Sequence, residues 1–270
     1  MEYANMGTLN IVAQQRQIPL PSYVLRALMK QILGGIHTFH DSGLIHRDIK
    51  PDNILLNSPP GSGLVRAKIS DFGFAKYEDL INEQTYTAGT IPYMAPEMFK
   101  KPLIVTQKVD IYALGITFYK LITHKYPVNE PTFEEQGKKI NLMQGIERPP
   151  EITDNLLWNL LSKMLEFDPN KRIIAFDAHL HPFFESPEAI ADISDEQKKL
   201  ASLADVAYKN NAINNPSFIV AETEIKKFFI HYIQIQQEKQ KQEQKLDEEE
   251  KKQKQILKNK IEQQQKKQQK

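Results

Sequence analysis

Apolar residues recur at helical spacing in three segments of the chain. Between a candidate N-cap at Ser22 and a Ser42-Gly43 stop, the repeated positions are Leu25, Leu28, Ile32, Ile36 and Phe39. This spacing predicts an amphipathic helix with one buried face. Residues 110–123 are apolar on nearly all faces, which predicts a helix in the middle of a helical domain. A third helix is predicted over residues 157–165.

Two short segments have the character of β-strands. Residues 54–56 and 68–70 are predicted strands, and the stretch 58–63 between them consists only of Ser, Pro and Gly, which are turn-forming residues. The expected fold class is therefore mainly α, with short two-stranded β elements.

The strong apolar pattern ends near residue 184. Residues 194–209 are still predicted to be helical, with a thin stripe at Leu200, Leu203 and Val206. From residue 234 onward the chain is almost entirely Gln, Lys and Glu, which favours a solvated single helix or a disordered segment. A partner-binding coiled coil is the alternative. We therefore divide the chain into residues 1–184, a helical extension 185–233 and a tail 234–270.

Composition narrows the classes of function. The formal net charge of +1 gives no electrostatic reason to expect nucleic acid or an acidic membrane as a partner. Without cysteine the chain cannot form disulfides, thiolate zinc sites or a cysteine nucleophile. No apolar run reaches the roughly 20 residues of a membrane span, and no secretory signal is recognised. We expect a cytoplasmic protein that binds neither nucleic acid nor membranes.

Three motifs then follow one another in a fixed order. His46-Arg47-Asp48 opens a loop that continues through Lys50 to Asn53, and further along lie the triplets 71–73 (Asp-Phe-Gly) and 95–97 (Ala-Pro-Glu). Together they resemble the catalytic loop, magnesium loop and activation-segment end of eukaryotic serine/threonine protein kinases. The residues after Asp71 are similar to the unc-51-like group of these kinases. The resemblance covers residues 1–184 and implies the kinase large lobe.

The resemblance assigns chemistry to four of these residues. Asp48 would accept the proton of the substrate hydroxyl, and Lys50 would place a positive charge near the transferring phosphoryl group. Asn53 and Asp71 supply hard oxygen ligands for Mg²⁺ beside the substrate phosphates. A lysine at position 50 goes with serine/threonine specificity in this family, so the implied substrate is a protein serine or threonine.

The first residues resemble the hinge that holds the adenine of ATP. The carbonyl of Glu2 and the amide of Ala4 would meet the edge of the base, and Leu55 would lie beneath the adenine ring. Thr8 would lie near the ribose. The implied cofactors are thus ATP and Mg²⁺.

Further matches concern the support of the site. Thr90 occupies the position that hydrogen-bonds the catalytic acid and lysine, and Glu97 with Arg172 matches a buried ion pair. Asp110 matches the aspartate that bonds the catalytic-loop backbone, although a simple N-cap is the alternative role. His46 and Phe72 match two members of a hydrophobic spine.

Arg47 matches the arginine that receives an activation-loop phosphate in this family. Thr85 and Thr87 are the candidate acceptors of that phosphate, and unmodified loop threonines are the alternative.

The resemblance starts at the hinge, so we expect the small lobe, with its β-sheet, Gly-rich loop and lysine, to be lacking. An incomplete chain of an active kinase, doubtful in activity by itself, is the interpretation we favour. The alternative is a catalytically weak binding or scaffolding module, with a protein partner at the exposed hinge face or the tail. A third possibility is that a separate chain supplies the small lobe.

Overall fold

The structure is a computed structural model that describes residues 4–77, 89–103, 105–207 and 219–228, together with isolated residues between 230 and 242. Residues 1–228 form one compact unit, and residues 229–270 are a second unit. All features discussed below lie in the first unit. No helix of the described ranges is long and apolar enough to cross a membrane.

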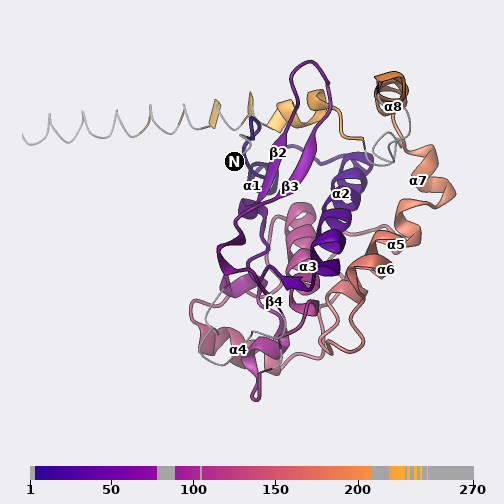
Figure 1. The fold of residues 1–270 in the computed structure, drawn as a ribbon. Helices are drawn as coiled ribbons and strands as arrows, with labels where there is room; N and C mark the ends of the chain where they lie inside the picture. The colour runs from indigo at the N-terminus through magenta and orange to yellow at the C-terminus, as the bar shows by residue number, and fades with distance from the viewer. Residues whose placement is uncertain are drawn as a thin grey trace, which may run out of the picture. The chain divides into compact units, whose positions relative to one another are not determined.

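Two long helices, α2 (Ser22–Asp41) and α3 (Lys108–Thr123), lie at the centre of the first unit (Figure 1). Four positions of the predicted apolar stripe of α2 are buried, with Leu28 and Ile36 fully covered, whereas Phe39 is only half-buried. Helix α2 packs against α6 (Ala175–His179) and the strand β3 (Arg66–Ile69). The structure thus confirms the first two helices predicted from periodicity.

The ends of α2 differ in how well the sequence predicted them. Ser22 is the first helical residue rather than the N-cap, which is Pro21, and its hydroxyl donates to the carboxylate of Asp192. The predicted N-cap is therefore wrong, because a distant acceptor binds the serine. At the other end Gly43 has a φ of 76°, and its amide closes the helix on the carbonyl of His40, as the glycine predicted.

The third predicted helix is α5 (Asn155–Met164), which packs on α3. The side chain of Asp154 accepts hydrogen bonds from the first amides of α5. The packing is close at Gly115 of α3, where a Cβ atom would come within 2.8 Å of Leu165. A larger residue at this position would force the two segments apart.

The described residues contain two sheets of two strands each. Strands β2 (Ile54–Asn57) and β3 (Arg66–Ile69) pair in antiparallel register, with Ile54 opposite Ile69. This hairpin confirms the two strands predicted from the sequence. The second sheet pairs β1 (Leu44–Ile45) with β4 (Lys76–Tyr77), and so joins the segment before the predicted catalytic loop to the segment after the predicted magnesium loop.

Four further helices are α1 (Asn10–Gln14), α4 (Phe133–Asn141), α7 (Pro187–Ala191) and α8 (Asp195–Ala207), and residues 222–228 are helical as well. Short 3₁₀ turns lie at Pro51–Asn53, Phe72–Phe74, Ile91–Tyr93, Pro96–Phe99 and Pro182–Phe184.

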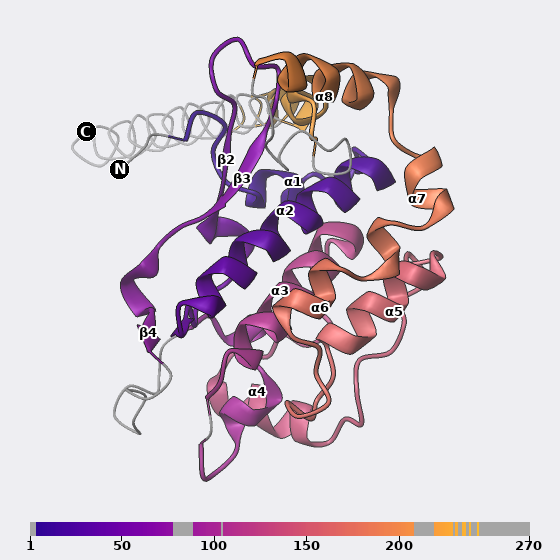
Figure 2. The same ribbon diagram turned by 45° about the vertical axis from the view of Figure 1, so that its right-hand side comes forward.

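The chain beyond residue 185 packs back onto the lobe. Helix α8 lies beside the loop of the β2–β3 hairpin (Figure 2), where Leu64, Ala201 and Ile219 form a buried cluster with Leu200 at its edge. Val220 accepts a hydrogen bond from the amide of Val65 at 2.8 Å. The predicted stripe of α8 is wrong at Leu203, which is 58% exposed.

Candidate active site

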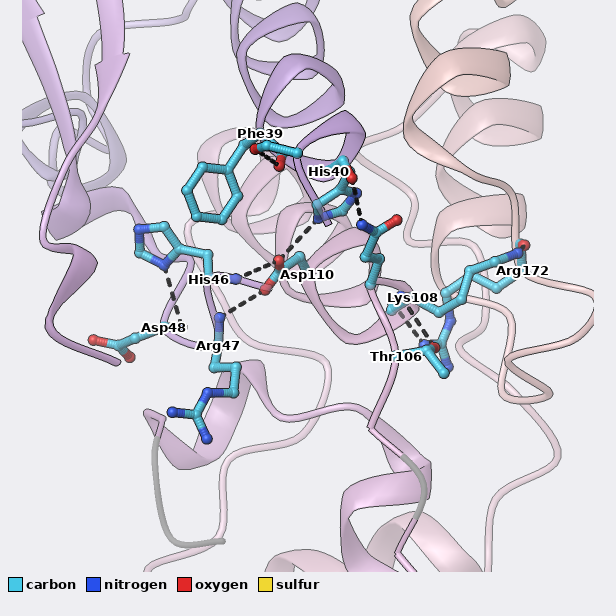
Figure 3. A network of polar contacts seen from close by, with 11 residues as sticks. Phe39, His40, His46, Arg47, Asp48, Thr106, Lys108, Asp110 and Arg172 are labelled. Carbon is cyan, nitrogen blue, oxygen red and sulfur yellow. Dashed lines mark hydrogen bonds and ion pairs between the residues drawn. The ribbon is translucent and has the colours of Figure 1, made fainter. Parts of the chain in front are cut away.

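A buried carboxylate at the start of α3 fixes the backbone of the catalytic loop. Asp110 is 1% exposed, and its two oxygens accept the amides of His46 and Arg47, each at 2.8 Å (Figure 3). Asp110 therefore makes the predicted bonds to the catalytic-loop backbone. It does not act as the N-cap of α3, since that position is Gln107.

The carboxylate of Asp48 is held on one oxygen by Thr90 and on the other by the predicted catalytic residues Lys50 and Asn53. Its Oδ1 accepts from the hydroxyl of Thr90 at 2.9 Å. Its Oδ2 accepts from Lys50 Nζ at 2.6 Å and from Asn53 Nδ2 at 2.9 Å. The Lys50 ammonium also donates to the Thr90 hydroxyl, so the four side chains form one network. Charge-assisted bonds of this kind fix the direction of the carboxylate.

Arg47 lies in the left-handed region, with φ 69°. Such a conformation costs energy for a non-glycine residue and persists only where the surroundings impose it. Asp110 imposes it by binding the Arg47 amide, while the side-chain Nε donates to the carbonyl of Phe74 at 2.6 Å. Burial lowers the pKa of Arg47, and the nearby charge of Asp110 acts against this. The candidate phosphate acceptors Thr85 and Thr87 lie outside the described residues.

The magnesium-loop residues lie next to the catalytic loop but are much more exposed. The carbonyl of Asn53 accepts the amide of Ser70 at 2.9 Å, which holds the two loops together. The next residue, Asp71, is exposed and has φ 63°. The side-chain nitrogen Nδ2 of Asn53 donates to the backbone carbonyl of Asp48 as well as to its carboxylate. The side-chain oxygen of Asn53 is therefore the atom left to bind a cation. Asn53 and Asp71 therefore offer the oxygen donors that Mg²⁺ prefers.

The aromatic contacts of Phe72 match the predicted spine. Its ring stacks on Phe39 with centroids 5.5 Å apart and meets the edge of His46 at 5.4 Å. His46 is fully buried, and its ring nitrogen is 3.0 Å from the carbonyl of Ser70. The other half of the Phe72 side chain is open, since the residue is 51% exposed.

The segment after the expected hinge runs beside β2. Met6 and Leu9 donate backbone hydrogen bonds to Leu56 and Ile54, and Thr8 forms a bridge with Leu55. Thr8 and Leu55 are thereby neighbours, as ribose and adenine contacts would require. Ala4 lies at the start of this described segment, whereas Glu2 lies outside the described residues.

The ion pair predicted between Glu97 and Arg172 is present and buried. The guanidinium donates to both carboxylate oxygens, at 2.7 and 2.9 Å, and Arg172 is 1% exposed. Arg172 also donates to two backbone carbonyls and lies over the ring of Tyr112 at 5.1 Å. These bonds compensate for the burial of the charge. They hold the end of the activation segment on the lobe.

One residue of the network was not recognised from the sequence. His40 is 8% exposed, and its ring nitrogen is 2.9 Å from Asp110 Oδ2, the oxygen that also accepts the His46 amide. The carbonyl of His40 accepts from Gln107 at 2.6 Å. The signal that could have found it was a histidine four residues after Ile36, in the buried stripe of α2, where a polar group needs a partner.

The fold and this arrangement are those of a protein kinase. The chain matches the protein kinase domain over residues 1–184 and belongs to the protein kinase family. A chain of the CAK complex of Chaetomium thermophilum, solved with ATP-gamma-S, shares the fold with a TM-score of 0.57. It is 23% identical, and the alignment covers 69% of this chain and 66% of that chain.

The relatives are serine/threonine kinases. The serine/threonine-protein kinase ULK3 of Rattus norvegicus is 33% identical over 187 residues, which cover 68% of this chain and 38% of the relative. The kinase/endoribonuclease IRE1 of Oryza sativa subsp. japonica is 35% identical over 193 residues, covering 68% of this chain and 21% of the relative. The chain thus spans about two fifths or less of these relatives. Because the two match about equally well, the unc-51-like placement stays a prediction.

Proposed function

We propose that the chain transfers the γ-phosphoryl group of magnesium-bound ATP to serine or threonine hydroxyls of proteins. The observation that carries this proposal is the Asp48 carboxylate, oriented by Lys50, Thr90 and Asn53 within 2.6–2.9 Å. The family membership and the kinase relatives point to the same reaction.

The residues of the site would divide the work as follows. Asp48 accepts the proton of the attacking hydroxyl and orients the hydroxyl oxygen toward the γ-phosphorus. That oxygen forms a bond to the γ-phosphorus while the bond from the phosphorus to the β–γ bridging oxygen breaks, and ADP leaves. The Lys50 ammonium is hydrogen-bonded to Asp48, and from this position its charge can stabilise the transferring phosphoryl group. Asn53 and Asp71 would hold Mg²⁺, which neutralises the charge that develops on the phosphates.

The nucleotide would lie over Leu55. Thr8 is its neighbour across the backbone bridge and would be close to the ribose. In this proposal Glu2 and Ala4 supply the backbone contacts to adenine. The Chaetomium thermophilum complex was solved bound to an ATP analogue, which supports ATP as the nucleotide.

A second candidate function is a binding or scaffolding module. The observation that favours it is a set of exposed aromatic side chains around the magnesium loop, with Phe72 at 51%, Phe74 at 43% and Tyr77 at 53%. Clustered exposed apolar groups commonly mark interaction surfaces. A partner protein could bind here without any phosphoryl transfer.

Exchange of Asp71 for Asn separates the two functions. It removes a charge from the proposed magnesium site, so phosphate transfer from labelled ATP to a serine/threonine peptide library should fall on the order of 10³-fold. The matched control is Asp177→Asn on α6, an exposed aspartate outside the proposed site. This control should keep its activity.

Activity retained by Asp71→Asn would contradict the magnesium assignment. If the wild-type chain transfers no phosphate, and the Asp71→Asn variant still binds a partner protein, the scaffolding module is favoured.

A further inference from the structure

A groove of about 710 Å³ lies between the C-terminal part of α2, the segment before α3 and the start of α6. Its volume is in the range of ligand-binding pockets. None of the four residues predicted for catalysis and magnesium binding lines it. Its lining comes from chain segments far apart in sequence, including His37, Lys101, Lys108 and Phe176.

One wall of the groove is apolar and only half covered. Ile174 is 45% exposed and Phe176 is 47% exposed, although both belong to a well-packed part of the lobe. The Phe176 ring meets the edge of His37, with centroids 5.2 Å apart, and is thereby held in place. Ile111 and Ala175, which are buried, form the apolar floor. Such a wall can receive one large apolar side chain.

The lining also carries exposed positive charge. Lys100 and Lys101 are exposed, and within the described ranges neither side chain has a hydrogen bond or ion pair. Lys108 lies deeper, where it donates to the carbonyl of Arg172. Burial, and secondly the charge of Arg172, lower the pKa of Lys108, whereas Asp177 raises it.

Two carboxylates, Asp41 and Glu97, also line the groove, and each has a partner. Asp41 Oδ1 is 3.3 Å from a ring nitrogen of His37, and the carboxylate of Glu97 is bound on both oxygens by Arg172. The lining thus contains three lysines and two carboxylates, of which only Asp41 is exposed. Complementary charge steers a partner and fixes its register.

We propose that this groove binds an acidic peptide segment of a partner protein, with one large apolar side chain against Ile174 and Phe176 and carboxylates facing Lys100 and Lys101. A peptide fits better than an enclosed small ligand, because both the apolar wall and the cations are exposed along the rim. The site does not depend on phosphoryl transfer, so it stands or falls separately from the proposed activity.

The test uses the full chain and a fluorescent peptide with one phenylalanine flanked on both sides by glutamates, followed by anisotropy. Lys100→Glu with Lys101→Glu should weaken binding at least tenfold, because the rim charge is reversed. The matched control is Lys138→Glu with Lys139→Glu on α4, an exposed lysine pair that gives the same change of net charge. The control should bind as the wild type does.

Phe176→Ser provides an independent variant, since the side chain is half exposed and its loss should leave the fold intact. It should weaken binding about fivefold or more, while a peptide with lysines in place of glutamates should not bind. If both lysine-pair variants lost the same affinity for the peptide, the effect would come from the net charge of the chain rather than from the groove. This result would overturn the proposal. Binding of dodecanoate but not of the peptide would overturn it in favour of a small amphipathic anion.

Discussion

The catalytic loop and the magnesium loop are neighbours with equally clear sequence motifs, but the lobe holds them very differently. His46 and Asp48 are 0% and 4% exposed; their loop is bonded to Asp110 and Thr90, and Asn53 bonds Asp48 within the loop. Residues 71–74 of the magnesium loop are all exposed. The described residues cover the first loop and leave the second open.

This difference indicates that different interactions order the two parts of the proposed site, the part that binds the acceptor hydroxyl and the part that binds the nucleotide. The acceptor side is preorganised by side chains of the lobe itself, so its geometry is present before any substrate binds. The nucleotide side has its donors in place but little around them. Nucleotide, metal or a covering protein surface would have to supply the remaining order there.

The largest expected effect follows from removing the anchor of the catalytic loop. Asp110→Ala leaves the amides of His46 and Arg47 without their acceptor and should lower the free energy of unfolding by about 3–5 kcal/mol. Urea denaturation measures this, and exposed Asp177→Ala is the control, with an expected change below about 0.5 kcal/mol. Equal effects of the two variants would show that Asp110 does not anchor the loop.

A smaller loss is expected at Thr90, whose hydroxyl lies between Lys50 and Asp48. Thr90→Val keeps the shape but removes both hydrogen bonds, which should cost about 1–3 kcal/mol of stability. Transfer activity should fall as well, because Asp48 loses one of its orienting bonds. The same exchange at exposed Thr38, whose hydroxyl bonds only within α2, serves as the control. A Thr90 variant as stable and active as that control would argue against the network.

The exposed loop should tolerate truncation better than the core. Phe72→Ala removes a side chain that is half exposed already, so we expect a loss of about 1 kcal/mol. Phe118→Ala in α3, where the side chain is fully buried, should cost about 3–5 kcal/mol. Thermal unfolding of both variants checks the contrast, which would fail if Phe72→Ala were as harmful as Phe118→Ala.

The smallest effect concerns pH. His181 accepts the Phe183 amide on Nδ1 and meets Asn159 with Nε2, an arrangement that fits the neutral ring. Burial, and secondly Lys163, lower its pKa. Below about pH 6.5 the unfolded chain therefore binds more protons at this residue, so stability falls with falling pH until the folded-state pKa is reached.

His181→Asn should accordingly reduce the slope of stability against pH between about pH 7 and 5, measured by urea denaturation. An unchanged slope would exclude His181 as its source. His179 contributes in the same direction, because burial and the charge of Lys30 lower its pKa also.

The sequence predicted those features that are local or that the family motif fixes. Periodicity gave α2, α3 and α5, and the motif led us to the partners of Asp48 and Asp110. The missed features depend on distant contacts. Ser22 binds Asp192 instead of capping its helix, and α8 buries Ala201 rather than Leu203 because the hairpin loop and residues 219–221 pack on that side. No local pattern contains this information.

Hydrogen exchange of the backbone amides tests the central contrast most directly. In the free chain, the amides of His46 and Arg47 should be strongly protected through Asp110, while residues 71–74 should exchange much faster. Addition of ATP with Mg²⁺ should slow exchange in residues 71–74 and leave the catalytic loop nearly unchanged. Equal protection of the two loops before ligand is added would contradict the account.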